Sequence, residues 1–249
     1  MRNTALLQRF ERNPRGRDLI VGDIHGCFSR LQAALSAIQF HPDAGDRLFS
    51  VGDLVDRGPE SAASLEWVAQ PWFHAVQGNH EDMAIRWGKR DCQMDPMVYA
   101  ANGGAWNIGN TPEERAEFSV AFDDLPIAIE IETREGIVGI VHADCPFASW
   151  DSLRTALLAT DLKNSERRHL RDMCMWDRSR IQTKFTGGVK DIRAVVVGHT
   201  PLERVEVLGN VYHIDTKGWH PNGKGFTFLN AATLTYETLP PQELLWEAA

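Results

Sequence analysis

The stretch Leu19-Ile20-Val21-Gly22-Asp23-Ile24-His25-Gly26 joins a short apolar run to a polar, glycine-bearing string. The same arrangement returns twice along the chain. Leu48-Phe49-Ser50-Val51 precedes Gly52-Asp53-Leu54-Val55-Asp56-Arg57-Gly58, and His74-Ala75-Val76 precedes Gly78-Asn79-His80-Glu81. Each apolar run is typical of a buried strand, so each polar string begins where a strand ends. Open α/β sheets build their sites at the carboxyl ends of the strands, and we expect a site here.

The polar strings supply Asp, His and Asn side chains, which are the oxygen and nitrogen donors of a two-metal centre. Phosphate esters hydrolyse slowly because an anion must be attacked at a charged centre. Two divalent ions about 3.5–4 Å apart neutralise that charge and generate a hydroxide. The sequence therefore predicts hydrolysis of phosphate esters.

The spacing of apolar residues extends this prediction to the whole fold. Helices are expected after each string, over about 31–38, 61–69 and 81–88, which gives a β–α–β–α–β first half with a mainly parallel sheet. The second half reads as a hairpin of 126–131 and 136–141, a helical stretch over about 150–176, and short strands at 195–197, 205–207, 211–214, 226–229 and 234–236. The predicted fold class is α/β, a sandwich of two sheets flanked by helices.

A chain of 249 residues with 43% hydrophobic residues can form one sizeable core. We expect a polar lead segment over 1–17, with one or two helical turns before a linker at 13–16, followed by a single domain over 18–249.

Composition and charge limit the classes of partner. The net charge of −8 disfavours nonspecific binding to nucleic acid or anionic membrane. We find neither an apolar run long enough to span a bilayer nor a signal-peptide core, so we expect a cytoplasmic protein. Four cysteines, Cys27, Cys92, Cys145 and Cys174, show no CxxC pairing and indicate neither a zinc knuckle nor a disulfide framework.

The three strings together resemble the metallophosphoesterase signature, and the forms at 52–58 and 78–81 are similar to its phosphoprotein phosphatase branch. Two later pieces fit the resemblance. His142 follows the apolar run 137–141, and His199 lies in Gly198-His199-Thr200 after 194–197. The resemblance covers residues 22 to 200 and implies the calcineurin-like metallophosphoesterase fold.

The resemblance also implies a role for each donor. Asp23 and His25 would hold one divalent ion, Asn79, His142 and His199 a second, and Asp53 would bridge the two. A set of carboxylate, amide and imidazole ligands without thiolate favours manganese, with iron or zinc as alternatives.

Four further residues are expected to act on the substrate. Arg57 and Arg178 would bind phosphate oxygens, with Arg180 as a rival for the second role. His80 would protonate the leaving oxygen, and Asp56 would orient its ring. A helix cap is the alternative role for Asp56.

Three other features are left with open interpretations. Asn102-Gly103-Gly104 resembles a family loop near the site or is an ordinary turn. The cluster of Arg167, Arg168, His169 and Arg171 is a solvated helix face or a docking patch for phosphorylated segments. Asp144, and Lys217 within Asp215-Thr216-Lys217-Gly218, depart from the family pattern and are expected near the rim of the site.

The leading hypothesis is a small serine/threonine protein phosphatase of the bacterial type. Its substrates would be phosphorylated proteins or peptides, with phosphotyrosine as a further class. One alternative is a symmetrical dinucleoside tetraphosphate hydrolase, and another is a catalytically inactive, metal-binding interaction protein. The sequence does not predict the oligomeric state.

Overall fold

A computed structural model describes residues 5–89 and 94–240. Two mixed sheets form its centre. The first sheet has six strands in the order β1-β5-β6-β7-β9-β8. Their bounds are β1 Leu7–Phe10, β5 Ala128–Thr133, β6 Gly136–Val141, β7 Ala194–Val197, β8 Glu206–Leu208 and β9 Val211–His213.

The second sheet has five strands in the order β11-β10-β2-β3-β4. Their bounds are β2 Asp18–Val21, β3 Arg47–Ser50, β4 Phe73–Ala75, β10 Phe226–Asn230 and β11 Tyr236–Leu239. Strands β2, β3 and β4 run parallel, as the repeated strand-and-helix pattern predicts, and β10 pairs antiparallel with β2.

Helices lie outside both sheets. The α-helices are α1 Phe28–Ala37, α2 Ser64–Val68, α3 Asn79–Gly88, α4 Pro96–Tyr99, α5 Ala105–Ile108, α6 Pro112–Asp123, α7 Trp150–Leu158, α8 Asn164–Trp176 and α9 Ser179–Thr183. Short helical turns of other types span Pro42–Ala44, Ser61–Ala63 and Ala100–Gly104.

The core follows from the two-residue period of the strands. In β2, Ile20 packs between the two sheets, whereas Leu19 and Val21 point toward the helices on the other side. In β7, Val196 faces the other sheet, and its neighbours Val195 and Val197 face α7 and α8. Both faces of these central strands are buried, which explains why they read as continuous apolar runs.

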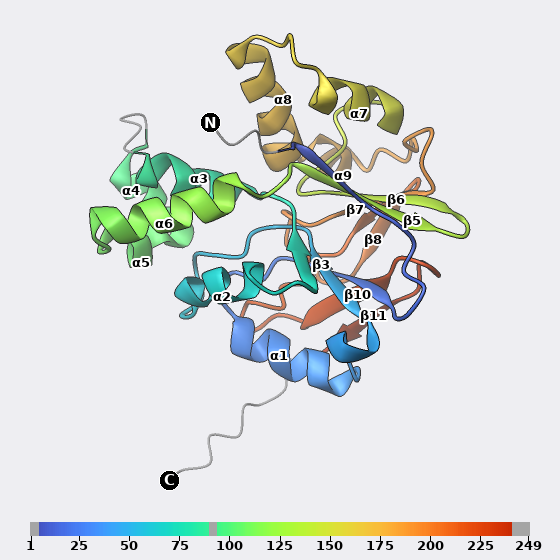
Figure 1. Cartoon of the computed structure of the whole chain (residues 1–249), viewed down its shortest axis with the longest axis horizontal. Coiled ribbons are helices and arrows are strands. Elements are labelled where there is room, and N and C mark those ends of the chain that lie inside the picture. The colour runs from blue at the N-terminus through green and yellow to red at the C-terminus, as the bar shows by residue number, and fades with distance from the viewer. Residues whose placement is uncertain (1–4, 90–93, 241–249) are drawn as a thin grey trace.

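The result is a four-layer arrangement, with α7 and α8 over the first sheet and α1 and α2 beneath the second (Figure 1). Helices α3 to α6 form a group at one end of the sandwich. The predicted fold class, an α/β two-sheet sandwich flanked by helices, is confirmed.

The expectation of helical turns near the N-terminus is wrong. Residues 7–10 form strand β1, which pairs in parallel with β5. Leu7 packs on the α7 and α8 side and Phe10 packs between the sheets, as alternating strand positions must. The Arg9 side chain forms an ion pair of 2.9 Å with Glu130. A four-residue strand offers too short a pattern to distinguish from a helical turn in the sequence.

Residues 112–123, for which no element was predicted, form α6. Its start carries a capping box between Thr111 and Glu114, followed by Pro112. The helix packs on α3, where the Ser119 hydroxyl donates to the Ile85 carbonyl oxygen at 3.2 Å. At this crossing a Cβ on Gly88 would lie 2.5 Å from the Arg115 carbonyl oxygen, so the approach requires glycine.

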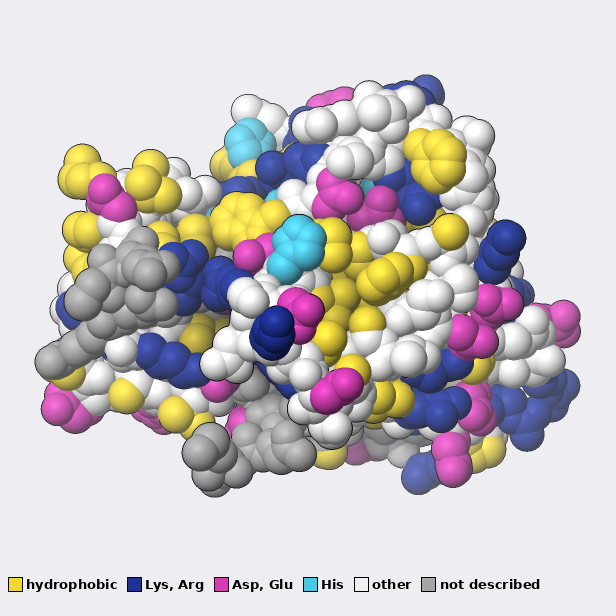
Figure 2. Space-filling view, turned by 90° about the horizontal axis from the view of Figure 1, so that it is seen from above, with side chains coloured by type: hydrophobic (Ala, Val, Ile, Leu, Met, Phe, Trp, Pro, Cys, Tyr) yellow, Lys and Arg dark blue, Asp and Glu magenta, His cyan; other side chains and the backbone are white. Residues whose placement is uncertain are grey.

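In the described part of the chain, no helix is long and apolar enough to cross a lipid bilayer. Basic and acidic side chains are interspersed over the face shown in Figure 2. Cys92 lies outside the described residues, and Cys27, Cys145 and Cys174 are buried free thiols.

Candidate metal centre

The six predicted ligand side chains converge at one end of the two sheets, although they lie up to 176 residues apart in the chain. Asp23 and His25 follow β2, Asp53 follows β3, and Asn79 opens α3 after β4. His142 follows β6 and His199 follows β7, so the first sheet completes the site. All six side chains are buried.

The first group of donors surrounds one oxygen of Asp53. His25 Nε2 lies 3.6 Å from Asp53 Oδ2 and 3.9 Å from Asp23 Oδ2. His25 Nδ1 donates to the Val55 carbonyl oxygen at 2.9 Å. Because that bond places the ring proton on Nδ1, Nε2 is left bare and directed at the carboxylates, which is the form that binds a metal ion.

The second group surrounds the other oxygen of Asp53. His142 Nε2 lies 3.3 Å from Asp53 Oδ1 and 2.9 Å from Asn79 Oδ1. His199 Nδ1 lies 2.9 Å from the same Asn79 oxygen. His142 Nδ1 donates to the Val51 carbonyl oxygen at 2.7 Å, so its Nε2 is also left for a ligand.

Asp53 therefore belongs to both candidate groups, with one oxygen directed at each. The first group also includes His80, whose Nε2 lies 3.8 Å from Asp53 Oδ2. Proximity alone therefore fits a ligand role for His80 as well as its predicted role in proton transfer.

The electrostatics of the site favour bound cations. Burial raises the pKa of Asp23 well above its usual value, and the charges of Asp215 and Asp53 raise it further. Burial and the Asp53 charge raise the pKa of Asp215 to about 6. Carboxylates that face one another in a buried space need positive charge to ionise together. Two divalent cations meet that need, and the mixed donor set fits them.

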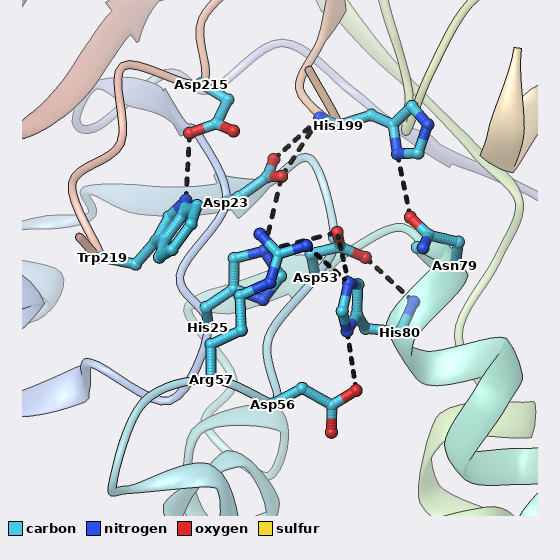
Figure 3. Close-up of polar contacts among 12 residues, drawn as sticks. Asp23, His25, Asp53, Asp56, Arg57, Asn79, His80, His199, Asp215 and Trp219 are labelled. Carbon is cyan, nitrogen blue, oxygen red and sulfur yellow. Dashed lines mark hydrogen bonds and ion pairs between the residues drawn. The ribbon is translucent and has the colours of Figure 1, made fainter. Parts of the chain in front are cut away.

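His80 is held between a carboxylate and a guanidinium (Figure 3). Its Nδ1 lies 2.6 Å from Asp56 Oδ2, and Trp106 Nε1 donates to the other Asp56 oxygen at 2.7 Å. Both oxygens of the buried Asp56 carboxylate are thus engaged by His80 and Trp106 and not by helix backbone N–H groups. The helix-cap alternative is therefore wrong. Arg57 Nη2 lies 3.2 Å from His80 Nε2.

The two candidate phosphate-binding arginines of the 178–180 segment differ in surroundings. Arg178 Nη2 donates to the carbonyl oxygen of the candidate ligand His199 at 3.5 Å. Arg180 is buried and forms an ion pair with Asp144, with Nε 2.9 Å from Oδ1. Of the two, only Arg178 lies beside the metal centre.

Backbone strain gathers in the same place. His25, Asp53, Asp56, Arg57 and His199 all have positive φ, between 45° and 71°. Residues other than glycine rarely adopt a positive φ, and those that do cluster at functional sites.

Three functional residues were given no role in the sequence analysis. Glu81 accepts backbone hydrogen bonds from Asp53, Leu54 and Gly78, each at 2.8 Å, and so fixes the loop that carries Asp53. Its place in the Gly78-Asn79-His80-Glu81 string was a usable signal. Trp219 and Asp215 also reach the site, but no motif marks Trp219.

The features left open in the sequence are resolved in part. Gly103 adopts a φ of 100° and accepts a hydrogen bond from the Arg57 backbone at 3.4 Å, so this loop borders the site. Asp144 is buried against Arg180 and is not at the rim, because its charge needs a partner there. Lys217 pairs with Glu203.

The basic cluster on α8 is not simply a solvated face. Arg168 forms ion pairs of 2.9 Å with Asp82 and Asp172, and Arg171 donates to the Gln77 side chain. With α3, these arginines border a cavity of about 260 Å³. A docking role for phosphorylated segments stays a prediction.

Comparison with known proteins agrees with this geometry. Residues 17–231 match the family model for calcineurin-like phosphoesterases, and the chain belongs to that family. It is therefore a metallophosphoesterase, an enzyme class that hydrolyses phosphate esters.

Two relatives and one solved structure illustrate the similarity. The chain is 34% identical to serine/threonine-protein phosphatase 1 of Salmonella typhimurium over 219 residues, which is 87% of this chain and 93% of that protein. It is 41% identical to the symmetrical bis(5'-nucleosyl)-tetraphosphatase of Chromobacterium violaceum, but over only 33% of this chain and 32% of that one. The crystal structure of a putative diadenosine tetraphosphatase shares the fold, with a TM-score of 0.64 and 20% identity. The match covers 95% of this chain and 98% of that one.

Proposed function

We propose that this chain is a protein phosphatase that hydrolyses phosphoserine and phosphothreonine in proteins or peptides, and phosphotyrosine as a further class. The proposed chemistry rests on one observation. The two ligand groups that share Asp53 lie beside the His80–Asp56 pair and beside Arg57. Similarity along nearly the whole length of a serine/threonine-protein phosphatase supports the substrate class.

Two divalent ions, when bound, would neutralise the charge of the phosphate and lower the pKa of a water molecule. Asp23 and His25 would hold one ion, Asn79, His142 and His199 the other, and Asp53 both. We propose manganese, with iron and zinc as alternatives, because the donors mix imidazole, amide and carboxylate.

The arginines would bind the substrate. Arg57 is exposed and presents a planar guanidinium that can donate to two phosphate oxygens at once. Arg178, beside His199, would supply a second set of donors. These contacts strengthen as charge develops on the phosphate oxygens in the transition state.

His80 would transfer the proton to the leaving oxygen. With Nδ1–H directed at Asp56, the neutral ring accepts from Arg57 through Nε2. A phosphate oxygen that accepts from Arg57 Nη2 in place of His80 leaves His80 Nε2 free to take up a proton from solvent and pass it to the leaving oxygen. The Asp56 carboxylate stabilises that protonated ring, and Trp106 holds the carboxylate in place.

A symmetrical dinucleoside tetraphosphate hydrolase is the second candidate. It is supported by the similarity of a third of the chain to the tetraphosphatase of Chromobacterium violaceum. The test compares phosphoserine, phosphothreonine and phosphotyrosine peptides with diadenosine tetraphosphate, all with manganese-loaded enzyme. We expect a higher kcat/KM on a phosphoserine or phosphothreonine peptide. A higher value on diadenosine tetraphosphate would overturn the proposal, and metal-loaded protein without any turnover would identify an inactive binding protein. The cytoplasmic location stays a prediction from the sequence.

A further inference from the structure

We propose that Trp219 is a positioning residue, which holds the Arg57 guanidinium in the orientation that binds phosphate. The inference rests on the proposed function only in that Arg57 contacts the phosphate of an ester, whatever group the ester carries.

Arg57 needs such support because little else restrains it. Its side chain is exposed, and among the described residues it forms no ion pair with a carboxylate. Its guanidinium contacts His80 through one nitrogen at 3.2 Å, and its backbone donates to Gly103 at 3.4 Å. An arginine side chain in water carries roughly 2 kcal/mol of rotamer entropy, which phosphate binding would otherwise have to overcome.

The face of the Trp219 indole supplies the restraint. The Arg57 guanidinium carbon lies 4.6 Å from the centre of the Trp219 ring, within the range of a cation–π contact. Stacking uses the face of the guanidinium and leaves its N–H groups free in the plane. Trp219 can therefore orient Arg57 without competing for the donors that phosphate needs, whereas the His80 contact occupies one of them.

Trp219 is itself held from several sides, as Figure 3 shows in part. Its Nε1 donates to Asp215 Oδ1 at 3.3 Å, and its carbonyl oxygen accepts from Arg30 Nη1 at 3.1 Å. The ring of His25 meets the indole edge-on, with the centroids 4.8 Å apart. The indole is thus a fixed surface between a metal ligand and the phosphate-binding arginine.

The test measures binding of inorganic phosphate to the manganese-loaded enzyme, from the dependence of Tm on phosphate concentration. Trp219→Leu keeps apolar bulk but removes the aromatic face, and Trp219→Phe keeps a face but removes the N–H. We expect Trp219→Leu to weaken phosphate binding about two- to fivefold, the size of an exposed cation–π contact. Trp219→Phe should stay within about twofold of the parent, because it retains the face.

A double-mutant cycle shows whether the effect passes through Arg57. In an Arg57→Ala background, Trp219→Leu should cause no further loss of phosphate affinity. Trp176 provides a matched control, because its ring lies 6.2 Å from that of the ligand His199, much as Trp219 lies beside His25. Trp176→Leu should change phosphate binding by the same factor in both backgrounds.

Three results would overturn the proposal. They are equal losses for Trp219→Leu with and without Arg57, equal losses for the Leu and Phe variants, and loss of manganese from Trp219→Leu. The last result would mean that Trp219 supports His25 instead. None of these measurements uses a phosphopeptide, so a failure of the proposed substrate class would leave this test unaffected.

Discussion

His80 lies within reach of three groups with different demands, the Asp56 carboxylate, the Arg57 guanidinium and the Asp53 carboxylate. The 2.6 Å contact with Asp56 fixes the ring, while Nε2 remains 3.8 Å from Asp53. What distinguishes His80 from the other histidines is the Arg57 guanidinium 3.2 Å from its Nε2, since a cation at that nitrogen disfavours a metal ion there and favours a role in proton transfer.

We predict that His80→Asn keeps both metal ions and loses roughly 10²–10⁴-fold in kcat on a phosphoserine peptide. The loss should be much smaller on an activated aryl phosphate, whose leaving group needs no proton. His142→Asn is the matched control and should lose metal. Metal analysis and kcat on both substrates decide the matter, and metal loss from His80→Asn would assign His80 to the metal centre.

Replacing Arg178 by alanine should lower activity, whereas replacing Arg180 should lower stability. Arg178→Ala should lower kcat/KM about 10- to 100-fold, with Tm nearly unchanged, because it removes a phosphate contact from a half-buried side chain. Arg180→Ala leaves Asp144 buried without its partner and should cost roughly 3–5 kcal/mol of stability. Kinetics and thermal unfolding of both variants check this, and the reverse pattern would exchange the two roles.

The start of α3 and the loop after β3 are joined by hydrogen bonds. Glu81 in the first turn of α3 accepts three backbone N–H groups, two of them from the loop that carries Asp53. Gly78 makes this possible, since a Cβ there would lie 2.3 Å from Asp53 Oδ1.

Glu81→Gln should therefore loosen the metal centre without replacing any of the proposed ligands. The amide presents its own N–H groups to backbone donors, which should cost roughly 1–3 kcal/mol of stability and reduce manganese affinity. Glu66→Gln, at an exposed site on α2, is the control and should change neither quantity. Unfolding free energy and manganese titration provide the measurements, and an unaltered metal affinity would contradict the role given to Glu81.

Strand β4 carries a histidine that should make stability depend on pH. His74 packs against Phe10 and Phe49, with ring centroids 4.3 and 5.1 Å apart. Burial, followed by the charge of Arg47, lowers the pKa of His74 to about 4. The unfolded chain, with a histidine pKa near 6.5, binds the proton more readily, so stability is lost as pH falls from about 6.5 to 4.

We predict that His74→Phe removes part of this loss, on the order of 1–3 kcal/mol between pH 7 and 4. The exposed His169→Gln should leave the pH dependence as it is in the parent. Unfolding free energies of the three proteins across this range give the comparison. Parallel curves for the parent and His74→Phe would show that His74 titrates normally in the folded state.

The elements also show what the sequence could predict. The strands that precede the predicted ligands are short apolar runs followed by characteristic polar strings, and the structure places them as expected. Strand β1 was misread, because its place in the fold depends on pairing with β5, more than a hundred residues away, and Leu7 and the partly buried Phe10 give no local pattern of their own. Helix α6 was missed although its capping box was visible, since its apolar residues do not gather on one face: Phe118 and Phe122 are buried, whereas Val120 is exposed.

For the whole molecule, the site is where the two sheets meet at their strand ends. The second sheet supplies Asp23, His25, Asp53 and Asn79, and the first supplies His142 and His199. The sequence could predict that these six side chains meet, because each follows a strand in the order that the family resemblance implies; their role as metal ligands stays a prediction. It could not predict the Trp219 contact with Arg57, which depends on a loop after β9 folding back over the site.

The convergence of these buried donors predicts a centre of two divalent ions bridged by Asp53. The most direct measurement is the number of manganese ions bound per chain after chelator treatment and reconstitution, in the parent and in Asp53→Asn. We predict two ions in the parent and fewer than one in the variant, because loss of the shared carboxylate weakens both sites together. One ion or none in the parent, or two retained in Asp53→Asn, would mean that Asp53 does not bridge two ions.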